Sequence, residues 1–233
     1  MNKRLAAISE FIGEKGFADV GTDHGYLPLY MLEKGYEGQI VASDINADPL
    51  ELARSNARHA GFEDKIRFIL CDGLDDYCID RVDTIVVAGM GGDTICGILD
   101  RAEWCMDSAY KLILQPMTKP EILRFWLSYN DFEITDELVV EDNGWIYQII
   151  CARYGSRVTL NDAELFTGRY ELAKESPYFP GILDKNIRRF EKLIHGLENS
   201  ADAEDISRLR FSRGVLDQLY DMKKAYSDGG TIK

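Results

Sequence analysis

The chain has 233 residues and a formal net charge of −13, and so acidic a chain argues at face value against a nucleic-acid partner. Apolar residues make up 45% of it, enough for one large domain or for a domain of about 150 residues with an appendage. The five cysteines form no C-x-x-C pair, so we expect a reducing cytoplasm and neither a disulfide nor a zinc framework. No apolar run approaches the ~20 residues of a membrane span, and the N-terminal residues lead into an amphipathic helix rather than a signal peptide.

The charge is unevenly distributed along the chain. Residues 1–154 hold 27 acidic and 14 basic side chains, whereas residues 155–233 hold 13 of each. This asymmetry predicts a boundary near Gly155, with one domain over residues 1–155 and a relatively basic second domain over residues 156–233.

The first elements of the chain predict a ligand site. Apolar side chains at helical spacing indicate an entry helix over residues 2–13. Phe17–Val20 then predicts a buried strand, which turns through glycines into a helix that has Pro28 near its start. A strand, a bare turn and a helix N-terminus suit a nucleotide-like ligand, because the backbone allows close approach and its N–H groups point outward.

The turn itself, Gly21-Thr22-Asp23-His24-Gly25, indicates the kind of ligand. A dinucleotide-binding turn has a further glycine where this chain has Asp23, and a carboxylate there would repel a pyrophosphate. The same carboxylate would accept a cationic or zwitterionic ligand such as S-adenosylmethionine. His24 is a candidate general base, although a hydrogen bond that holds the turn is the favoured interpretation. A purely structural turn is the remaining alternative.

Acidic residues follow the next two predicted strands. The strand over residues 39–43 ends at Asp44-Ile45-Asn46, and Asp44 stands 23 residues after Gly21, which suits binding of ribose hydroxyls. The strand over residues 66–70 is followed by Asp72-Gly73. Because parallel strands end at one edge of a sheet, these acids predict a nucleoside pocket there. The alternative is that they only cap helices or turns.

A second glycine-rich segment, residues 89–92, follows the strand predicted over residues 82–87. The next strand, residues 111–114, ends at Gln115-Pro116, and Thr118 is predicted to cap the helix that follows. We predict an acceptor site there, since bare backbone lets a flat base lie close. Its residues would be Met90, Gly91, Gly92, Gln115 and Pro116. Alternatively, the glycines only allow the helix to pack closely on the sheet.

The last part of the first domain changes its period. Residues 132–140 and 145–152 indicate two strands joined by a turn that contains Asn-Gly, a hairpin signal. Five strands that alternate with helices, followed by a hairpin, predict an α/β sheet with an antiparallel edge.

Strand signals vanish beyond Gly155, and two helices with apolar seams are predicted. The first seam is Leu183, Ile187, Phe190, Ile194 and Leu197. After a break at residues 199–202, the second is Ile206, Leu209, Leu216 and Tyr220, with Arg213 intruding. Such helices form an antiparallel hairpin. Its basic residues are Lys185, Arg188, Arg189, Lys192, Arg208, Arg210 and Arg213, which form either an RNA-binding surface or a solvated coiled-coil surface.

In combination and in this order, the motifs resemble the bacterial tRNA (adenine-22-N1)-methyltransferase family, the TrmK type. The matching stretches are residues 19–28, 43–46, 72–74, 88–92 and 114–116. The resemblance implies a Rossmann-like class I methyltransferase sheet with an antiparallel terminal hairpin, followed by a C-terminal α-helical coiled-coil hairpin. It also implies S-adenosylmethionine as the cofactor and tRNA as the partner. The donor-binding residues would be Asp19, Gly21, Thr22, Asp23, His24, Gly25, Asp44, Ile45, Asn46, Asp72, Gly73 and Gly89.

The expected chemistry is simple. Adenine N1 carries an in-plane lone pair and loses no proton before attack, so orienting the ring against the methyl group could suffice without a metal. Asp23 is the candidate catalytic residue, easing the new positive charge, and a role in donor binding or capping alone is equally open. Alternatives are a class I methyltransferase acting on a small molecule, a protein or another RNA, and an RNA-binding protein with a relic donor pocket. The oligomeric state is open, with a monomer favoured.

Overall fold

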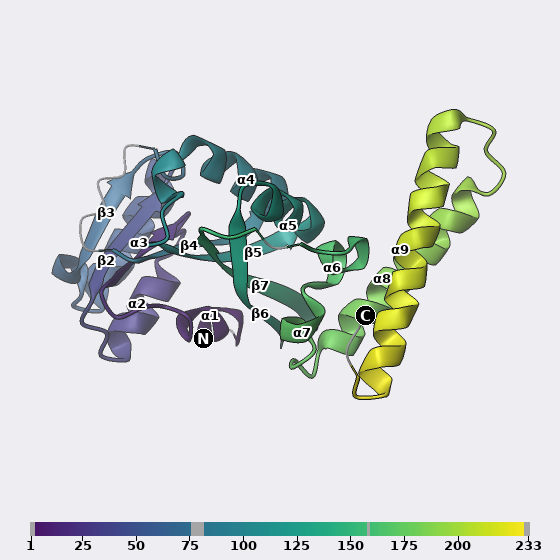
Figure 1. Ribbon diagram of the computed structural model, residues 1–233. Helices are drawn as coiled ribbons and strands as arrows, with labels where there is room; N and C mark the ends of the chain where they lie inside the picture. Colours follow the sequence, from purple (N-terminus) through teal and green to yellow (C-terminus); the bar gives the residue numbers. More distant parts are fainter. Residues whose placement is uncertain (1–2, 76–81, 158, 231–233) are drawn as a thin grey trace.

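The computed structural model describes residues 3–75, 82–157 and 159–230. A seven-stranded sheet with the strand order β3-β2-β1-β4-β5-β7-β6 forms its centre (Figure 1). The five parallel strands are β1 (Gly16–Val20), β2 (Gln39–Asp44), β3 (Ile66–Leu70), β4 (Thr84–Gly91) and β5 (Lys111–Thr118). The antiparallel pair is β6 (Phe132–Asp142) and β7 (Trp145–Tyr154). The predicted α/β sheet with an antiparallel edge is confirmed.

Helices cover both faces of the sheet. On one face lie α1 (Lys3–Ser9), α2 (Tyr26–Glu33) and α3 (Ala47–His59), whose buried Ile8, Leu27 and Ala57 share one core cluster. On the other lie α4 (Gly92–Arg101) and α5 (Pro120–Tyr129). Two short 3-10 helices lie in connections: η1 (Glu63–Lys65) between α3 and β3, and η2 (Glu103–Cys105) between α4 and β5. Figure 1 shows α4 and α5 on the side of the sheet opposite α1 and α2. Because β1 is buried along its whole length, its apolar run needs no alternation.

Three local predictions are corrected by the structure. The entry helix ends at Ser9 rather than at residue 13. The strand predicted to stop at Val87 continues as β4 through the glycine-rich segment, with a bulge around Gly89, so residues 89–91 belong to a strand. Thr118 does not cap α5, because β5 runs through it and Lys119, at φ 53°, is the N-cap residue.

The antiparallel hairpin has the predicted turn. Asp142 pairs with Trp145, which leaves Asn143 and Gly144 as the two turn residues, at φ 53° and 82°. Two positive φ values in a two-residue loop match the strand twist, and Asn-Gly favours them.

The helices described after residue 158 are α6 (Asp162–Thr167), α7 (Tyr170–Ala173), α8 (Phe179–Leu197) and α9 (Ala203–Ser227). The first predicted seam is confirmed, since all five of its residues on α8 are buried. The second is wrong in part, because Ile206 and Tyr220 are exposed and the buried residues of α9 are Ser212, Val215, Leu219 and Met222. Ser212, a small polar residue, occupies a core position of α9. The spacing of the large apolar residues therefore did not reveal the buried face of this helix. Arg213 is exposed and does not enter the core.

The segment between the sheet and the long helices packs against both. The sequence showed no sign of α6 and α7, yet Ala163, Phe166 and Tyr170 share a core cluster with α8 and α9. Toward the sheet, Ser176 Oγ donates a hydrogen bond to the Val139 carbonyl at 2.5 Å. The hairpin of α8 and α9 extends from the end of the molecule opposite β3 (Figure 1). A domain boundary near residue 155 therefore stays a prediction, with residues 162–176 contacting both parts.

Candidate active site

A cavity of about 700 Å³ lies at the carboxyl ends of β1 to β4. Ten of the twelve residues predicted to bind the donor line it: Asp19, Gly21, Thr22, Asp23, Asp44, Ile45, Asn46, Asp72, Gly73 and Gly89. His24 and Gly25 do not. The cavity therefore occupies the edge of the sheet at which parallel α/β folds bind ligands.

The turn after β1 is held by short backbone contacts. The N–H groups of Gly21 and Thr22 both donate to the Ser43 carbonyl on β2, at 2.9 and 2.8 Å. Gly21 has φ 71°, a conformation that favours glycine, and a Cβ there would displace the end of the Met90 side chain, whose Cε would lie 2.2 Å away. Gly25 begins α2, and a Cβ on it would lie 3.2 Å from Cβ of Ala53 on α3. Gly25 thus packs the turn against α3 from outside the cavity.

Asp19 is a buried acid at the end of β1. It accepts a hydrogen bond from Thr22 Oγ1 at 2.7 Å, and only 6% of the residue is exposed. Burial raises the pKa of Asp19 to about 6 and nearby Asp44 adds to the rise, whereas the Thr22 hydrogen bond and the Arg4 guanidinium oppose it. A cation entering the cavity would favour the ionised carboxylate.

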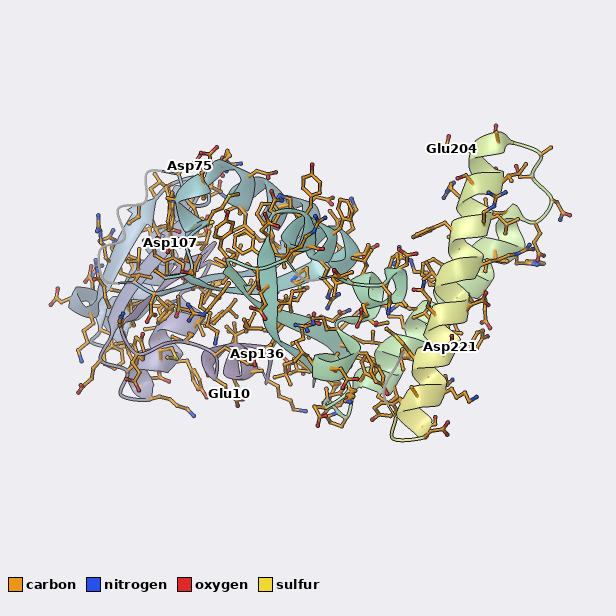
Figure 2. All side chains as sticks on the ribbon, in the orientation of Figure 1. Glu10, Asp75, Asp107, Asp136, Glu204 and Asp221 are labelled. Carbon is orange, nitrogen blue, oxygen red and sulfur yellow. The ribbon has the colours of Figure 1, made fainter. Side chains whose placement is uncertain are left out.

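Asp44 and Asp72 stand at the ends of the next two strands. Asp44 accepts backbone hydrogen bonds from Asn46 at 2.9 Å and from Asp23 at 3.4 Å, which fix its carboxylate at the cavity wall. Asp72 pairs with Arg101 of α4 at 2.8 Å, and Arg101 also contacts Asp75 at 3.2 Å. Figure 2 labels Asp75 at this end of the molecule. The two acids therefore serve the local structure and the cavity together.

The side chains of Asp23 and His24 lie toward solvent. Asp23 has φ 52°, and 68% of its side chain is exposed at 3.6 Å from Nε2 of His24. The His24 ring stacks on Tyr26 with centroids 5.1 Å apart, while its carbonyl accepts a hydrogen bond from Asn56. The imidazole thus flanks the turn. The favoured interpretation, a His24 hydrogen bond that holds the turn, and the alternative of a general base both stay predictions.

The residues predicted for the acceptor site are divided by the structure. Met90 lines the cavity beside Gly21. Gly91 is the N-cap residue of α4 with an ordinary φ of −68°, and a Cβ on Gly92 would lie 2.3 Å from the Lys119 carbonyl oxygen. The packing explanation therefore holds for Gly92. Gln115 and Pro116 are buried in β5 and are not among the cavity-lining residues.

Several cavity residues escaped the sequence analysis. Arg4 reaches the cavity from α1, and Thr94 and Arg101 reach it from α4. Two features of the sequence could have indicated these cations. Arg4 is a basic residue within the apolar pattern of the entry helix, and Arg101 stands one helix length after the second glycine-rich segment. Of the cavity-lining residues given by the structure, Arg4 and Arg101 are the two cations.

The basic residues of the C-terminal hairpin differ in their partners. Arg189 pairs with Glu121 of α5 at 3.0 Å, Arg213 with Glu198 at 3.5 Å and Arg208 with Asp205 at 3.5 Å. In contrast, the other four are exposed and take part in none of the ion pairs found among residues 3–75, 82–157 and 159–230: Lys185, Arg188, Lys192 and Arg210. Arg189 therefore links the hairpin to α5 of the sheet domain. The exposed cations Lys185, Arg188 and Lys192 of α8 take part in none of these ion pairs.

Neither a cluster of metal-ligating side chains nor a helix able to span a membrane is found among the described residues. Within the part of the chain that the structure describes, no three His, Cys, Asp or Glu side chains gather as a metal site. Over those same residues, no helix combines the length and apolarity that crossing a bilayer would need. Cys78 lies outside the described residues.

The sequence of this chain matches the model of a known protein family. The model for the tRNA (adenine(22)-N(1))-methyltransferases, TrmK, matches residues 17–212, which include the cavity lining except Arg4 and Leu5, and most of the hairpin. The chain belongs to the TrmK family. A Bacillus subtilis tRNA (adenine(22)-N(1))-methyltransferase is 27% identical over 210 residues, which are 88% of this chain and 88% of that protein.

Solved structures of TrmK proteins share the fold. The crystal structure of the B. subtilis TrmK has a TM-score of 0.85 at 24% identity, covering 95% of this chain and 98% of that one. A putative tRNA (m1A22) methyltransferase from Streptococcus pneumoniae, solved in complex with S-adenosyl-L-methionine, has a TM-score of 0.76 at 29% identity. That comparison covers 92% of this chain and 98% of the other. This chain therefore shares its fold with these two proteins over more than nine tenths of its length.

Proposed function

We propose that this TrmK protein transfers the methyl group of S-adenosylmethionine to N1 of adenosine 22 in tRNA, with the donor in the cavity at the ends of β1 to β4. The observation that carries the proposal is the set of acids Asp19, Asp44 and Asp72, which line one cavity from three adjacent strands. A volume of about 700 Å³ suits a nucleoside carrying an amino-acid group, since ligand cavities span roughly 300–1,000 Å³.

The strand order gives the donor a direction. Asp44 at the end of β2 binds the ribose hydroxyls, and the loop with Asp72 after β3 lies beside the adenine. The methionyl group then lies across the bare Gly21 turn toward β4. This direction brings the methyl group to the end of the cavity where Met90 lies, next to the predicted acceptor site.

The reaction is one displacement at carbon. The N1 lone pair attacks the methyl carbon, the carbon–sulfur bond breaks, and sulfur keeps the bonding electron pair, so that S-adenosylhomocysteine leaves. The positive charge of the sulfonium passes to the adenine ring. Exposed Asp23 would stabilise that charge at the mouth of the cavity.

The tRNA is proposed to bind the α8 face of the C-terminal hairpin. Lys185, Arg188 and Lys192 stand three and four residues apart, so they share the side of α8 opposite its buried seam. The acids Asp184 and Glu191 instead contact Lys223 and Tyr220 of α9. These two acids of α8 are thereby engaged within the hairpin, while the three cations face outward, toward the phosphates that attract them. A cytoplasmic location follows, since tRNA is the substrate.

Transfer of a labelled methyl group to unmodified tRNA transcripts tests this function. We expect incorporation into a transcript with adenosine at position 22, mapped as 1-methyladenosine, and none into a matched transcript with guanosine there. Calorimetry with S-adenosylmethionine measures the donor step separately. Donor binding with methylation of another base, a protein or a small molecule would refute the acceptor, and absence of donor binding would indicate a relic pocket.

A further inference from the structure

Arg4 occupies one end of the cavity, although it belongs to a helix outside the glycine motifs. Its Nη1 donates a hydrogen bond to Oε1 of Gln115 on β5, and its guanidinium carbon lies 5.6 Å from the centre of the Tyr147 ring on β7. A Cβ on Gly89 would lie 3.4 Å from Nη1. The guanidinium therefore lies beside the bulge of β4, at the ends of β4 and β5.

The direct contacts of Arg4 are uncharged, and its guanidinium acts on the Asp19 carboxyl only over a longer distance, lowering the pKa of that group. Gln115 and Tyr147 are uncharged, and Arg4 takes part in no ion pair among the residues that the structure describes. The other cation of the cavity lining, Arg101, is held by Asp72 and Asp75 near β3. A guanidinium has five donors and binds carboxylates in a planar fork. Arg4 is therefore the cavity cation available to an incoming anion.

The donor presents one carboxylate, and the strand order places it near Arg4. With the ribose at β2 and the adenine toward β3, the methionyl group extends past β1 to β4, where Gly89 and Arg4 lie. Asp19, also in the cavity lining, stands at the end of β1, near enough to Arg4 for the two charges to interact. An acid and a guanidinium on one cavity end match the ammonium and carboxylate of an α-amino acid.

We infer that Arg4 binds the carboxylate of the donor's methionyl group and so makes the site specific for a donor that retains that carboxylate. The inference rests on the proposed function, because it assumes S-adenosylmethionine in this cavity. It assigns α1 a direct part in donor selection. A contact of Arg4 with the RNA, or a structural link from α1 to β5, are the competing roles.

Three ligands distinguish these roles when their dissociation constants are measured by calorimetry. They are S-adenosylmethionine, decarboxylated S-adenosylmethionine, which keeps the sulfonium and the amine, and 5′-methylthioadenosine, which lacks the whole amino-acid group. The variants are Arg4→Gln and, as a matched control, Lys3→Gln. Lys3 belongs to the same helix and loses the same charge, but it is exposed and pairs with Glu141 at 3.4 Å.

We expect Arg4→Gln to weaken S-adenosylmethionine binding by roughly ten- to a hundredfold, the size of a lost charge-assisted interaction. Affinity for 5′-methylthioadenosine should stay at the wild-type value, and the preference for the carboxylated donor over the decarboxylated one should fall by the same factor. Lys3→Gln should keep that preference. Arg4→Lys should restore part of it, because the charge returns without the planar fork.

Other results would overturn the inference. Equal weakening of all three ligands would mean that Arg4 only positions α1. An unchanged donor constant with a raised KM for tRNA would assign Arg4 to the RNA. If the wild-type protein bound no S-adenosylmethionine, the proposed function would fail first, and this inference would fail with it.

Discussion

Arg124 of α5 and Glu137 of β6 form an ion pair of 2.7 Å with 1% and 2% of their side chains exposed. Arg124 also donates to the Leu165 carbonyl of α6 at 3.0 Å, and Glu137 accepts a hydrogen bond from the Arg169 backbone just before α7. One buried pair thus joins the sheet domain to the segment that leads into the hairpin.

Removal of one partner of this pair should destabilise the protein strongly. In Glu137→Gln the Arg124 charge stays buried without its counter-ion, which costs about 3–5 kcal/mol in comparable sites. Urea unfolding should show this loss, whereas Arg124→Met with Glu137→Met should recover part of it, because no charge is then left unpaired. A single variant as stable as the wild type would refute the energetic role.

Asp44→Asn should weaken donor binding without unfolding the protein. The variant keeps one acceptor oxygen for Asn46 but loses the charge-assisted bonds to the ribose, worth about 1.5–3 kcal/mol. Calorimetry with S-adenosylmethionine measures the difference. Asp48→Asn, an exposed change in the first turn of α3, is the matched control and should bind normally. Wild-type affinity in Asp44→Asn would remove Asp44 from the donor site.

The pH dependence of stability should reveal Asp19. Its pKa is 3.8 in the absence of burial and about 6 in the folded protein, so between these values the folded state holds a proton that the unfolded state has released. Stability therefore falls as pH rises from about 4 to 6. Asp19→Asn removes this contribution. The free energy of unfolding of the variant, relative to that of the wild type, should therefore rise by on the order of 2–3 kcal/mol between about pH 4 and 6 and stay constant above pH 6. A difference that does not change with pH would contradict the raised pKa.

Gly91 and Gly92 should respond differently to alanine. In Gly92→Ala the new Cβ would meet the Lys119 carbonyl oxygen at 2.3 Å, so the melting temperature should fall. In Gly91→Ala the Cβ would lie 3.2 Å from Thr118 Oγ1, and the protein should fold and bind donor. If Gly91 lies under the acceptor base, the Gly91→Ala variant should methylate tRNA about tenfold more slowly or worse, since small displacements of reacting groups are costly. A wild-type rate in Gly91→Ala would leave these glycines a packing role alone.

The exposed cations of α8 should contribute to tRNA affinity and not to donor affinity. Changing Lys185, Arg188 and Lys192 to Gln should reduce the slope of log affinity against log salt by about 2–3. The same triple change at the exposed Lys15, Lys34 and Lys65 of the sheet domain is the matched control. Truncation at residue 155 is a poorer test, since it removes the Leu165 carbonyl and the Arg169 backbone N–H that bind the buried Arg124 and Glu137. Equal slopes for the two triple variants would exclude the α8 face.

The parts of the site that could be predicted are those fixed by local rules. Asp44 and Asp72 follow strands, and parallel strands end at one edge, so their meeting at a cavity follows from the chain alone. Arg4 and Arg101 reach the cavity from helices, and their direction depends on how α1 and α4 pack on opposite faces. No motif carries that information.

Packing also decided the features of the fold that the sequence did not reveal. The second seam follows Ser212 because a small side chain fits where α8 and α9 touch, against the preference for large apolar residues. Arg124 and Glu137 look like ordinary surface residues of a helix and a strand until α6 covers them. Lys119 adopts a left-handed conformation that lysine rarely takes, and its carbonyl oxygen lies where any side chain at residue 92 would have its Cβ.

The pairing of β1 with β4 joins two halves of the chain that are distant in sequence, with Phe17 opposite Thr84. The strands β1 to β3 form one local unit and β4 to β7 another, and the cavity spans the line between them. Bringing the halves together is the costly long-range step of folding, because it closes the longest loop in the parallel sheet. A bound donor contacts both halves and so stabilises the pairing of β1 with β4. It should therefore slow amide hydrogen exchange at Val20 and Val87 more than at the outer strand β3.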